Sequence, residues 1–234
     1  MEAIMKDQKS RIDTARQALS AIQNYFPMRP QSAVLLFAFL LFFTHRTSAQ
    51  NETKNLLVAF ENSYSMEAKA DYSRAIKTLK DVYQENSYEI NLRLGWLHYL
   101  AGLHLESITY YQKAIKLRPY SIEPKFGYVL PAAAMGNWAQ VIYQYQEILK
   151  IDPQNTIANY RMGSIYYNKQ DYLRAEKYIE KVVNLYPFDY DSNLLFGWIS
   201  FKLGKLREAK VLFTKVLLNK PKDASALEGL SLIK

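Results

Sequence analysis

The chain has no cysteine among its 234 residues. This absence excludes disulfides, thiol catalysis, thiolate metal sites and an anchor on an acylated cysteine, so packing must stabilise the fold. Histidine is almost as scarce. None of the three histidines, His45, His98 and His104, pairs with a second histidine or a carboxylate at a metal-ligand spacing. We therefore expect no metal centre.

A strong charge of one sign is also missing. Lys and Arg outnumber Asp and Glu by 30 to 22, and the net charge of +8 is not gathered into a dense basic cluster, so we expect no nucleic-acid partner. The sequence contains no nucleophile elbow, phosphate-binding loop, dinucleotide fingerprint or isolated carboxylate pair. We predict that the protein is not an enzyme and binds no cofactor.

Only one long apolar run occurs, over residues 33–43. A helix of that length, at ~1.5 Å per residue, covers roughly half of a ~30 Å hydrocarbon core, so the run is short for a membrane span. Arg29 precedes it and small residues follow it at 47–49. This order is typical of a signal peptide, which we predict at residues 28–49.

Cleavage of that signal after Ala49 would leave Gln50 at the mature N-terminus. Because a signal peptide begins close to the start codon, our hypothesis is that Met28 is the true start and residues 1–27 are a mis-called extension. The alternative is that residues 1–27 are a cytoplasmic tail and residues 33–43 an uncleaved membrane anchor. Either arrangement predicts export, to a bacterial periplasm or as a secreted protein.

After the apolar run, one spacing dominates the chain. Four prolines follow one another at intervals of 34 residues, namely Pro119, Pro153, Pro187 and Pro221. Seventeen residues before each proline lies a turn column of Gly102, Gly136, Gln170 and Gly204. Small and bulky residues recur in further columns on either side of that turn. The pattern predicts a repeated unit of helix, turn, helix and terminating proline, whose apolar faces are buried by stacking.

These columns resemble the tetratricopeptide repeat, which has Leu-Gly and Tyr in its first helix, Ala and Phe in its second, and a closing Pro. The closest match carries Met162-Gly163, Tyr166, Asp171-Tyr172, Ala175 and Pro187. The resemblance implies an all-α fold, an α-α superhelix (solenoid) of about five helical hairpins. We place the units at 56–87, 88–121, 122–155, 156–189 and 190–223, within an array spanning 50–223. Residues 224–234 are predicted to form a capping helix with Leu227, Leu230 and Ile233 as its apolar face.

The third unit departs from the pattern. Val129 replaces the small residue of its first helix, and Pro131 falls inside that helix, where proline usually costs ~3 kcal/mol. Gly127, four residues earlier, relieves part of that strain. Pro131 is interpreted either as a tolerated kink or as a kink that re-aims the inner surface of the array.

The resemblance also implies a concave side lined by the first helices, along the stripe at positions 5, 9 and 12 of each unit. In this sequence the stripe is rich in aromatic residues. We give half of the stripe to the core and expect Trp96, Tyr99, Tyr160, Tyr167 and Trp198 to be exposed. The predicted partner-binding residues are Trp96, Tyr99, Tyr160, Tyr167, Trp198, Phe201, Arg93 and Arg161.

Arg93 and Arg161 stand at position 6. They either meet an anionic group of a partner, or are solvated or salt-bridged to Glu89 or another local carboxylate. Because positions 5 and 9 carry no Lys or Asn, a carboxylate-binding clamp of the kind found in some family members is not expected. Asn91, Asn159 and Asn193 recur at position 4. We predict that they bond to backbone at the junction with the preceding unit and play a structural role.

Two functions remain open from the sequence. The first is an exported scaffold that binds a protein or peptide along the aromatic stripe, since rings bury large area at low entropic cost. The second is a repeat protein that binds a glycan or, less well suited to export, single-stranded nucleic acid by stacking on the same rings.

Overall fold

The computed structural model describes residues 13, 17 and 51–233. Every regular element in these ranges is an α-helix or a helical turn, and they contain no strand. The all-α fold predicted from the sequence is therefore confirmed. The predicted signal peptide, its cleavage site between Ala49 and Gln50, and the start at Met28 lie outside the described residues. Within the described ranges, no helix combines the length and the apolar character that crossing a membrane requires.

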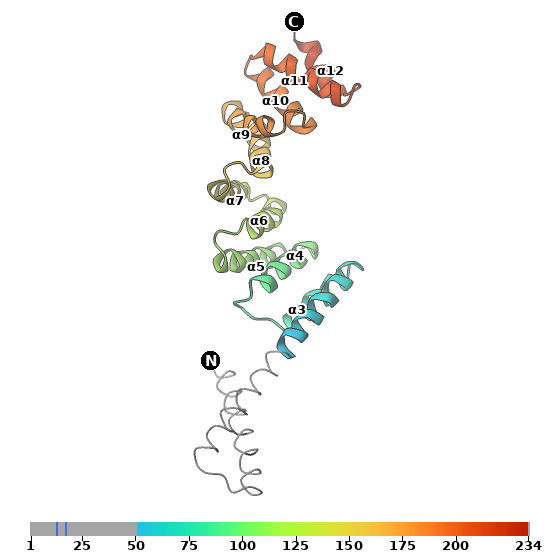
Figure 1. The fold of residues 1–234 in the computed structure, drawn as a ribbon, viewed down its shortest axis with the longest axis vertical. Helices are drawn as coiled ribbons and strands as arrows, with labels where there is room; N and C mark the ends of the chain where they lie inside the picture. Colours follow the sequence, from blue (N-terminus) through green and yellow to red (C-terminus); the bar gives the residue numbers. More distant parts are fainter. Residues whose placement is uncertain (1–12, 14–16, 18–50, 234) are drawn as a thin grey trace, which may run out of the picture. The chain divides into compact units, whose positions relative to one another are not determined.

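The chain divides into two compact units, with the boundary between Val82 and Tyr83. In the first unit, residues 51–67 are helical and α3 spans Tyr72–Lys80 (Figure 1). Asp71 caps α3 by accepting the backbone N–H of Arg74 at 3.2 Å, as N-cap aspartates do. Ala75 and Leu79 are fully buried on the inner face of α3. These elements form a helical hairpin.

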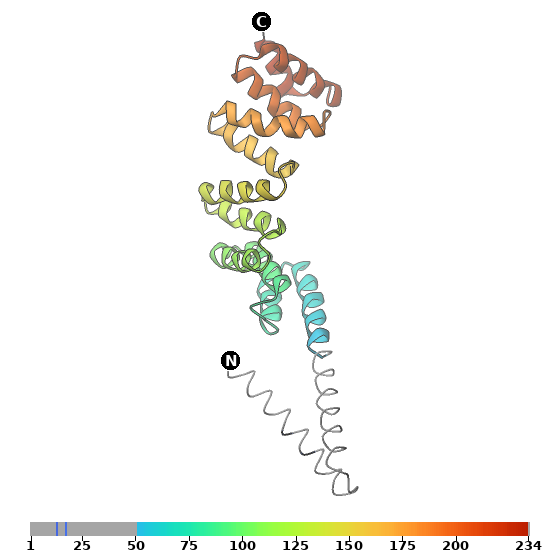
Figure 2. The same cartoon turned by 60° about the vertical axis from the view of Figure 1, so that its left-hand side comes forward.

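The second unit is a stack of antiparallel helix pairs (Figures 1 and 2). The pairs are α4 (Tyr88–Leu100) with α5 (His104–Leu117), α6 (Glu123–Ala134) with α7 (Trp138–Ile151), α8 (Thr156–Asn168) with α9 (Tyr172–Leu185), and α10 (Tyr190–Lys202) with α11 (Leu206–Asn219). The last helix, α12 (Ala224–Leu232), follows α11. Each helix packs against the next, and α4 also packs against α6, α8 against α10, and α10 against α12.

Short polar residues start most of these helices. Side-chain oxygens accept backbone N–H groups at the starts of the helices that follow Ser87, Asn137, Asn155, Asp171, Asp189 and Asp223. The turn column predicted from the sequence adopts the left-handed conformation in every pair, with φ of 74° at Gly102, 71° at Gly136, 60° at Gln170 and 75° at Gly204. Caps and turns together explain why each hairpin begins and reverses where it does.

Two large rings fix the spacing between units. A Cβ added to Gly95 would lie 2.9 Å from the ring of Tyr111, and one added to Gly127 would lie 2.2 Å from the same ring. The same arrangement recurs further along the chain, where Phe213 lies between Gly197 and Gly229. Each ring thus fits between a glycine of its own pair and a glycine of the next first helix.

Helix α6 runs through Pro131 without interruption from Glu123 to Ala134, and Pro131 itself is buried. Gly127 does more than relieve strain, because its missing side chain makes room for Tyr111. The first helices α6 and α8 pack less closely than the other neighbouring first helices. Whether Pro131 re-aims the surface next to it stays a prediction.

The asparagine column has the structural role predicted for it. Asn91, Asn159 and Asn193 each donate to two backbone carbonyls of the preceding junction, at distances of 2.6–3.2 Å. In the third unit Lys125 occupies this position and donates to the equivalent carbonyls of Pro119 and Ser121. Lys125 is buried, and this burial lowers its pKa.

The terminal helix forms as predicted, but with a different inner face. Ala226 and Gly229 are buried, and Leu230 and Ile233 pack against the cluster around Phe213. Leu227, which we expected on this face, is 48% exposed. The prediction was wrong at this residue because the helix turns Gly229 toward Phe213, where a Cβ would lie 2.4 Å from the ring.

Candidate partner-binding site

The predicted partner-binding rings lie on three first helices. Trp96 and Tyr99 are on α4, Tyr160 and Tyr167 on α8, and Trp198 and Phe201 on α10. All six are half-buried. The expectation that five of them would be exposed was therefore wrong, since each ring lays one face on its neighbours. We call these six residues the ring stripe.

Rings of the stripe contact one another and the start of the following helix. The centroids of Trp96 and Tyr99 are 5.8 Å apart, and those of Tyr99 and His104 are 5.9 Å apart. On α8, Tyr167 lies 5.7 Å from Tyr172. These distances are typical of favourable aromatic pairs, so the rings are held in place before any partner arrives.

Trp198 is the most constrained ring of the stripe. Its indole N–H donates to Ser225 Oγ at 2.8 Å, and its ring meets Phe213 edge-on at 5.1 Å and Phe201 at 5.8 Å. These contacts tie α10 to α12. Trp198 is consequently part of the packing at this junction, with only one edge left to a partner.

The two predicted arginines differ. Arg93 is 7% exposed, which is not compatible with an easily reached anion-binding group, and Glu89 is paired with Arg118 at 3.3 Å. Arg93 is thus covered at position 6 of α4, and its contact with a partner stays a prediction. Arg161 on α8 is exposed, as a contact for a partner requires.

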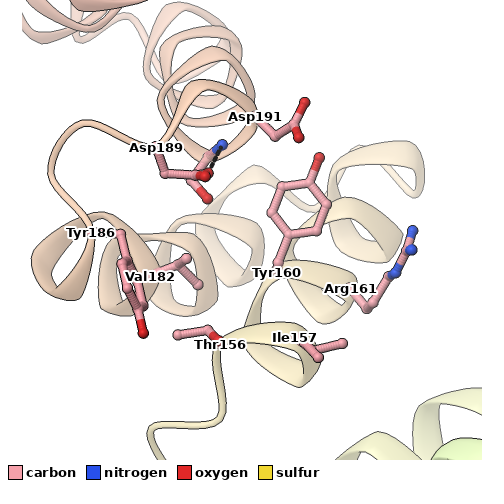
Figure 3. A pocket seen from close by; sticks show the side chains of 9 residues that line it. Thr156, Ile157, Tyr160, Arg161, Val182, Tyr186, Asp189 and Asp191 are labelled. Atoms are coloured by element: carbon pink, nitrogen blue, oxygen red, sulfur yellow. Dashed lines mark hydrogen bonds between the residues drawn. The ribbon is translucent and has the colours of Figure 1, made fainter.

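Arg161 lies on the rim of a hollow that sequence reasoning did not predict (Figure 3). The hollow measures about 350 Å³ and lies between α8, the end of α9 and the start of α10. Its walls include Thr156, Tyr160 and Arg161 of α8, Tyr186 after α9, and Asp189 and Asp191 at the start of α10. We call it the fourth-unit hollow.

Polar groups of the fourth-unit hollow gather on the side of α10. Asp189 accepts the backbone N–H of Ser192 at 2.8 Å as the cap of α10. Tyr160 points its hydroxyl end toward Asp191 (Figure 3). Arg161 lies on the side of Tyr160 that faces away from Tyr186. Burial raises the pKa of Tyr160, and the negative charge of Asp191 adds to that effect. Tyr160 therefore stays a neutral hydroxyl at ordinary pH.

The sequence prediction did not include Asp189, Asp191, Thr156 and Tyr186. It considered what the residues at each repeat position share, so a unit that differs at one position was overlooked. A usable signal existed, since the first position of the unit holds tyrosine in two units and threonine in the fourth. A small residue at a column that elsewhere holds a ring leaves space, and the carboxylates lie next to that space.

The two histidines in the described ranges act in packing, as predicted. His98 is 1% exposed, its Nδ1 lies 2.7 Å from the carbonyl oxygen of Leu94, and its ring lies 4.8 Å from that of Tyr110. His104 contacts Tyr99 as described above. Over the described residues, no group of three or more His, Cys, Asp and Glu side chains is arranged to hold a metal ion.

Comparisons with known proteins identify the repeat. Two family models described as tetratricopeptide repeat match the chain, one over residues 65–122 and the other over residues 157–189. The stacked helix pairs of residues 83–233 form a solenoid of the tetratricopeptide-repeat type. The resemblance read from the columns around Pro119 and Pro187 is supported by both matches. No curated protein sequence matches this chain.

Solved structures show the same fold. A tetratricopeptide repeat protein from Parabacteroides merdae superimposes with a TM-score of 0.65 at 20% identity, covering 75% of this chain and 71% of that one. MamA from Desulfovibrio magneticus gives 0.61 at 18% identity, with 73% and 98% covered. YrrB, a repeat protein described as having an unusual peptide-binding site, gives 0.62 at 14% identity, with 80% and 97% covered.

Proposed function

We propose that the protein is an exported, non-enzymatic scaffold that binds a protein or peptide partner along the ring stripe. Repeat proteins of this type generally bind protein or peptide partners, and one similar structure carries a peptide-binding site. The observation that carries the proposal is the two half-buried ring pairs, Trp96 with Tyr99 on α4 and Tyr167 of α8 with Tyr172 of α9. In the proposed assembly these first helices line the concave side of the array.

Two physical properties suit the ring stripe to this task. Each ring is held by a neighbour, so little side-chain entropy remains to be lost on binding. Each ring also keeps part of its surface in water, and removing that surface from water on association stabilises a complex. Tyr99 and Tyr167 add hydroxyl groups, which give the surface hydrogen-bonding directions that a purely apolar stripe would lack.

The test is selection of peptides from a displayed random library on the immobilised chain, followed by measurement of their affinities for variants. We expect Trp96→Leu and Tyr167→Leu to weaken the selected peptides about tenfold each, because interface rings of this kind contribute more than ~1 kcal/mol. The matched controls are Tyr143→Leu and Tyr120→Leu, which remove exposed tyrosines outside the stripe. The controls should leave the affinity unchanged.

The competing function is binding of a non-protein polymer to the same rings. The immobilised chain is therefore also exposed to a panel of glycans and to single-stranded oligonucleotides. Enrichment of a glycan or an oligonucleotide that depends on Trp96, with no peptide selected, would replace the proposal with this alternative.

Export is tested separately by N-terminal sequencing of the chain recovered from the culture medium or periplasm of the expression host. We expect a mature chain that begins at Gln50. A chain that keeps its first residue and sediments with the membrane fraction would instead support the anchored form, in which residues 33–43 stay uncleaved.

A further inference from the structure

Two tyrosines show what normally fills the space at the junction of successive units. Tyr88 begins α4, and its hydroxyl lies 2.8 Å from Ser121 Oγ and donates to the carboxylate of Glu123 at 3.2 Å. Tyr190 begins α10 and occupies the same place in its unit. Its hydroxyl donates to the carboxylate of Asp223 at 2.5 Å. Each tyrosine thus connects the start of one unit with the start of the next.

A cation covers each of these rings. The guanidinium carbon of Arg118 lies 4.6 Å from the centroid of Tyr88, and Lys220 Nζ lies 5.4 Å from that of Tyr190. Such contacts are favourable because the face of an aromatic ring carries partial negative charge. Ring, cation and hydroxyl acceptor together fill the junction.

The fourth unit keeps the acceptors and lacks the ring. Thr156 stands where the other two units have tyrosine. Asp189 stands at the place of Asp223, and Asp191 stands at the place of Glu123. The fourth-unit hollow lies beside Thr156, with both carboxylates at its edge (Figure 3). The hollow therefore lies at the position in the repeat where the sister units have a tyrosine side chain.

The third unit solves the same problem differently. Ile122 begins that unit and packs, partly buried, against the main hydrophobic cluster. The positions that hold the acceptors in the fourth unit are Asn155 and Ile157 there, so no pair of carboxylates faces Ile122. Only the fourth unit combines a small first residue with two carboxylates.

We propose that the fourth-unit hollow binds a tyrosine side chain presented by the partner, an inference that rests on the proposed function. The incoming phenol ring lies between Tyr160 and Tyr186, and its hydroxyl donates to Asp189 or Asp191. A carboxylate accepts several hydrogen bonds, so Asp189 can cap α10 and still accept the hydroxyl. The partner supplies in trans the group that Tyr88 and Tyr190 supply in their own units.

Other side chains fit the hollow less well. Phenylalanine would fill the volume but would bring no hydroxyl to donate to Asp189 or Asp191, as each sister tyrosine donates to a carboxylate, and an acceptor left unpaired at a contact is costly. Lysine would satisfy the carboxylates but would not cover Tyr160 and Tyr186, and Arg161 on the rim disfavours a second cation. The combination of ring surface and acceptors matches a phenol.

The test uses three short capped peptides, acetyl-Gly-Tyr-Gly-amide and its counterparts with phenylalanine or lysine in the centre. Their binding to the full chain is followed by NMR titration, with the methyl groups of Thr156 and Ile157 as reporters. We expect the tyrosine peptide to shift these methyl signals and to bind about tenfold more tightly than either counterpart, because its hydrogen bond is made to a charged acceptor.

Two variants locate the binding. Thr156→Tyr places a ring in the hollow from within the chain, so it should abolish binding of the tyrosine peptide and raise the thermal midpoint. Asp191→Asn removes one charged acceptor at an exposed position and should weaken the tyrosine peptide about fivefold, which keeps the test decisive if Thr156→Tyr folds poorly. Glu228→Gln removes a charged acceptor at an exposed position of α12, outside the hollow, and serves as the matched control for the acceptor, with unchanged binding.

Three results would overturn the proposal. These are equal affinity for the tyrosine and phenylalanine peptides, tighter binding of the lysine peptide, and tyrosine binding that neither Thr156→Tyr nor Asp191→Asn changes. Failure of the tyrosine pocket alone can be distinguished from failure of the scaffold function. Library peptides that lose affinity with Trp96→Leu but not with Thr156→Tyr would leave the scaffold standing without the tyrosine pocket.

Discussion

The turn inside each helix pair depends on a single residue with positive φ. Gly102, Gly136 and Gly204 adopt this conformation without steric cost because they have no Cβ. Gln170 adopts it at φ 60° with a full side chain, and a left-handed residue of this kind costs about 1–2 kcal/mol. The fourth unit therefore carries local strain at its turn that the other three pairs avoid.

Replacing Gln170 with glycine should relieve that strain. We expect Gln170→Gly to raise the free energy of unfolding by about 1 kcal/mol, because the steric gain exceeds the entropy that glycine adds to the unfolded chain. The reciprocal change Gly136→Gln is the matched control and should lower the stability by a similar amount. Chemical denaturation followed by circular dichroism measures both, and a loss of stability in Gln170→Gly would contradict the prediction.

The sequence identified single residues well wherever one residue type recurs. Asn91, Asn159 and Asn193 were predicted to bond to backbone on their spacing alone, and all three do. Lys125 could not be found in this way, because a different side chain reaches the same carbonyls in the third unit. Recurrence reveals a shared role only when the chemistry is also shared.

At the scale of the helices, the ring of Tyr111 sets how closely α4 and α6 approach α5. The ring has a glycine on either side, so it cannot move away from an added methyl group. In the pair of α8 and α9, Gly163 faces Ile179 instead, and an added Cβ would lie 3.4 Å from the nearest atom. Replacement of glycine by a larger residue is therefore tolerated better at Gly163 on α8 than at Gly127 on α6.

This difference gives a paired prediction. Gly127→Ala should lower the free energy of unfolding by about 1–3 kcal/mol, because overpacking outweighs the higher helix propensity of alanine. Gly163→Ala should be neutral or stabilising by up to about 1 kcal/mol, since it gains propensity with little crowding. Thermal and denaturant unfolding of both variants measure the change in the free energy of unfolding. Equal changes would contradict the prediction and show that the ring of Tyr111 moves to make room for the added methyl group.

Helix pairs were predictable from periodicity, but contacts between pairs were not. The partners Tyr111 and Gly127 belong to different units, so a column examined within one unit cannot connect them. The fourth-unit hollow was missed for the same reason, because Thr156 gains its meaning only beside Asp189 and Asp191. The ring stripe was found by position, yet its burial depends on neighbours such as Ser225 and Phe213, which lie far along the chain.

At the scale of the whole array, many tyrosines take part in packing. Eight tyrosines in the part of the chain that the structure describes have a raised pKa. Burial is the largest cause at most of them, and at Tyr190 the largest cause is the hydrogen bond to Asp223. The residues with a raised pKa are Tyr88, Tyr110, Tyr111, Tyr145, Tyr160, Tyr167, Tyr178 and Tyr190. Residues 83–234 therefore hold many phenols that resist ionisation.

The array should lose stability in alkaline solution. An unfolded tyrosine ionises with a pKa of about 10, so above that pH the unfolded chain has lost protons that the folded chain keeps. The contribution is fully present below about pH 10 and declines as the pH rises through the folded pKa values. The lowered pKa of Lys125 acts in the opposite direction, but as one group against eight.

The measurement compares thermal midpoints at about pH 8 and about pH 11, with tyrosinate absorbance recorded in the same samples. We expect a lower midpoint at the higher pH and a jump in tyrosinate absorbance that coincides with unfolding. Unchanged midpoints, or full ionisation of the tyrosines while the helices persist, would contradict the prediction.

The ring that one unit inserts between two glycines also limits how such a chain can evolve. If the third unit were deleted, position 6 of the unit that follows Tyr111 would hold Arg161 in place of Gly127. The Arg161 side chain would then start inside the space of the Tyr111 ring. Units of this array are therefore not interchangeable modules. Gain or loss of a repeat requires a compensating substitution in the neighbouring unit. This requirement preserves the number and order of repeats once neighbouring units fit one another.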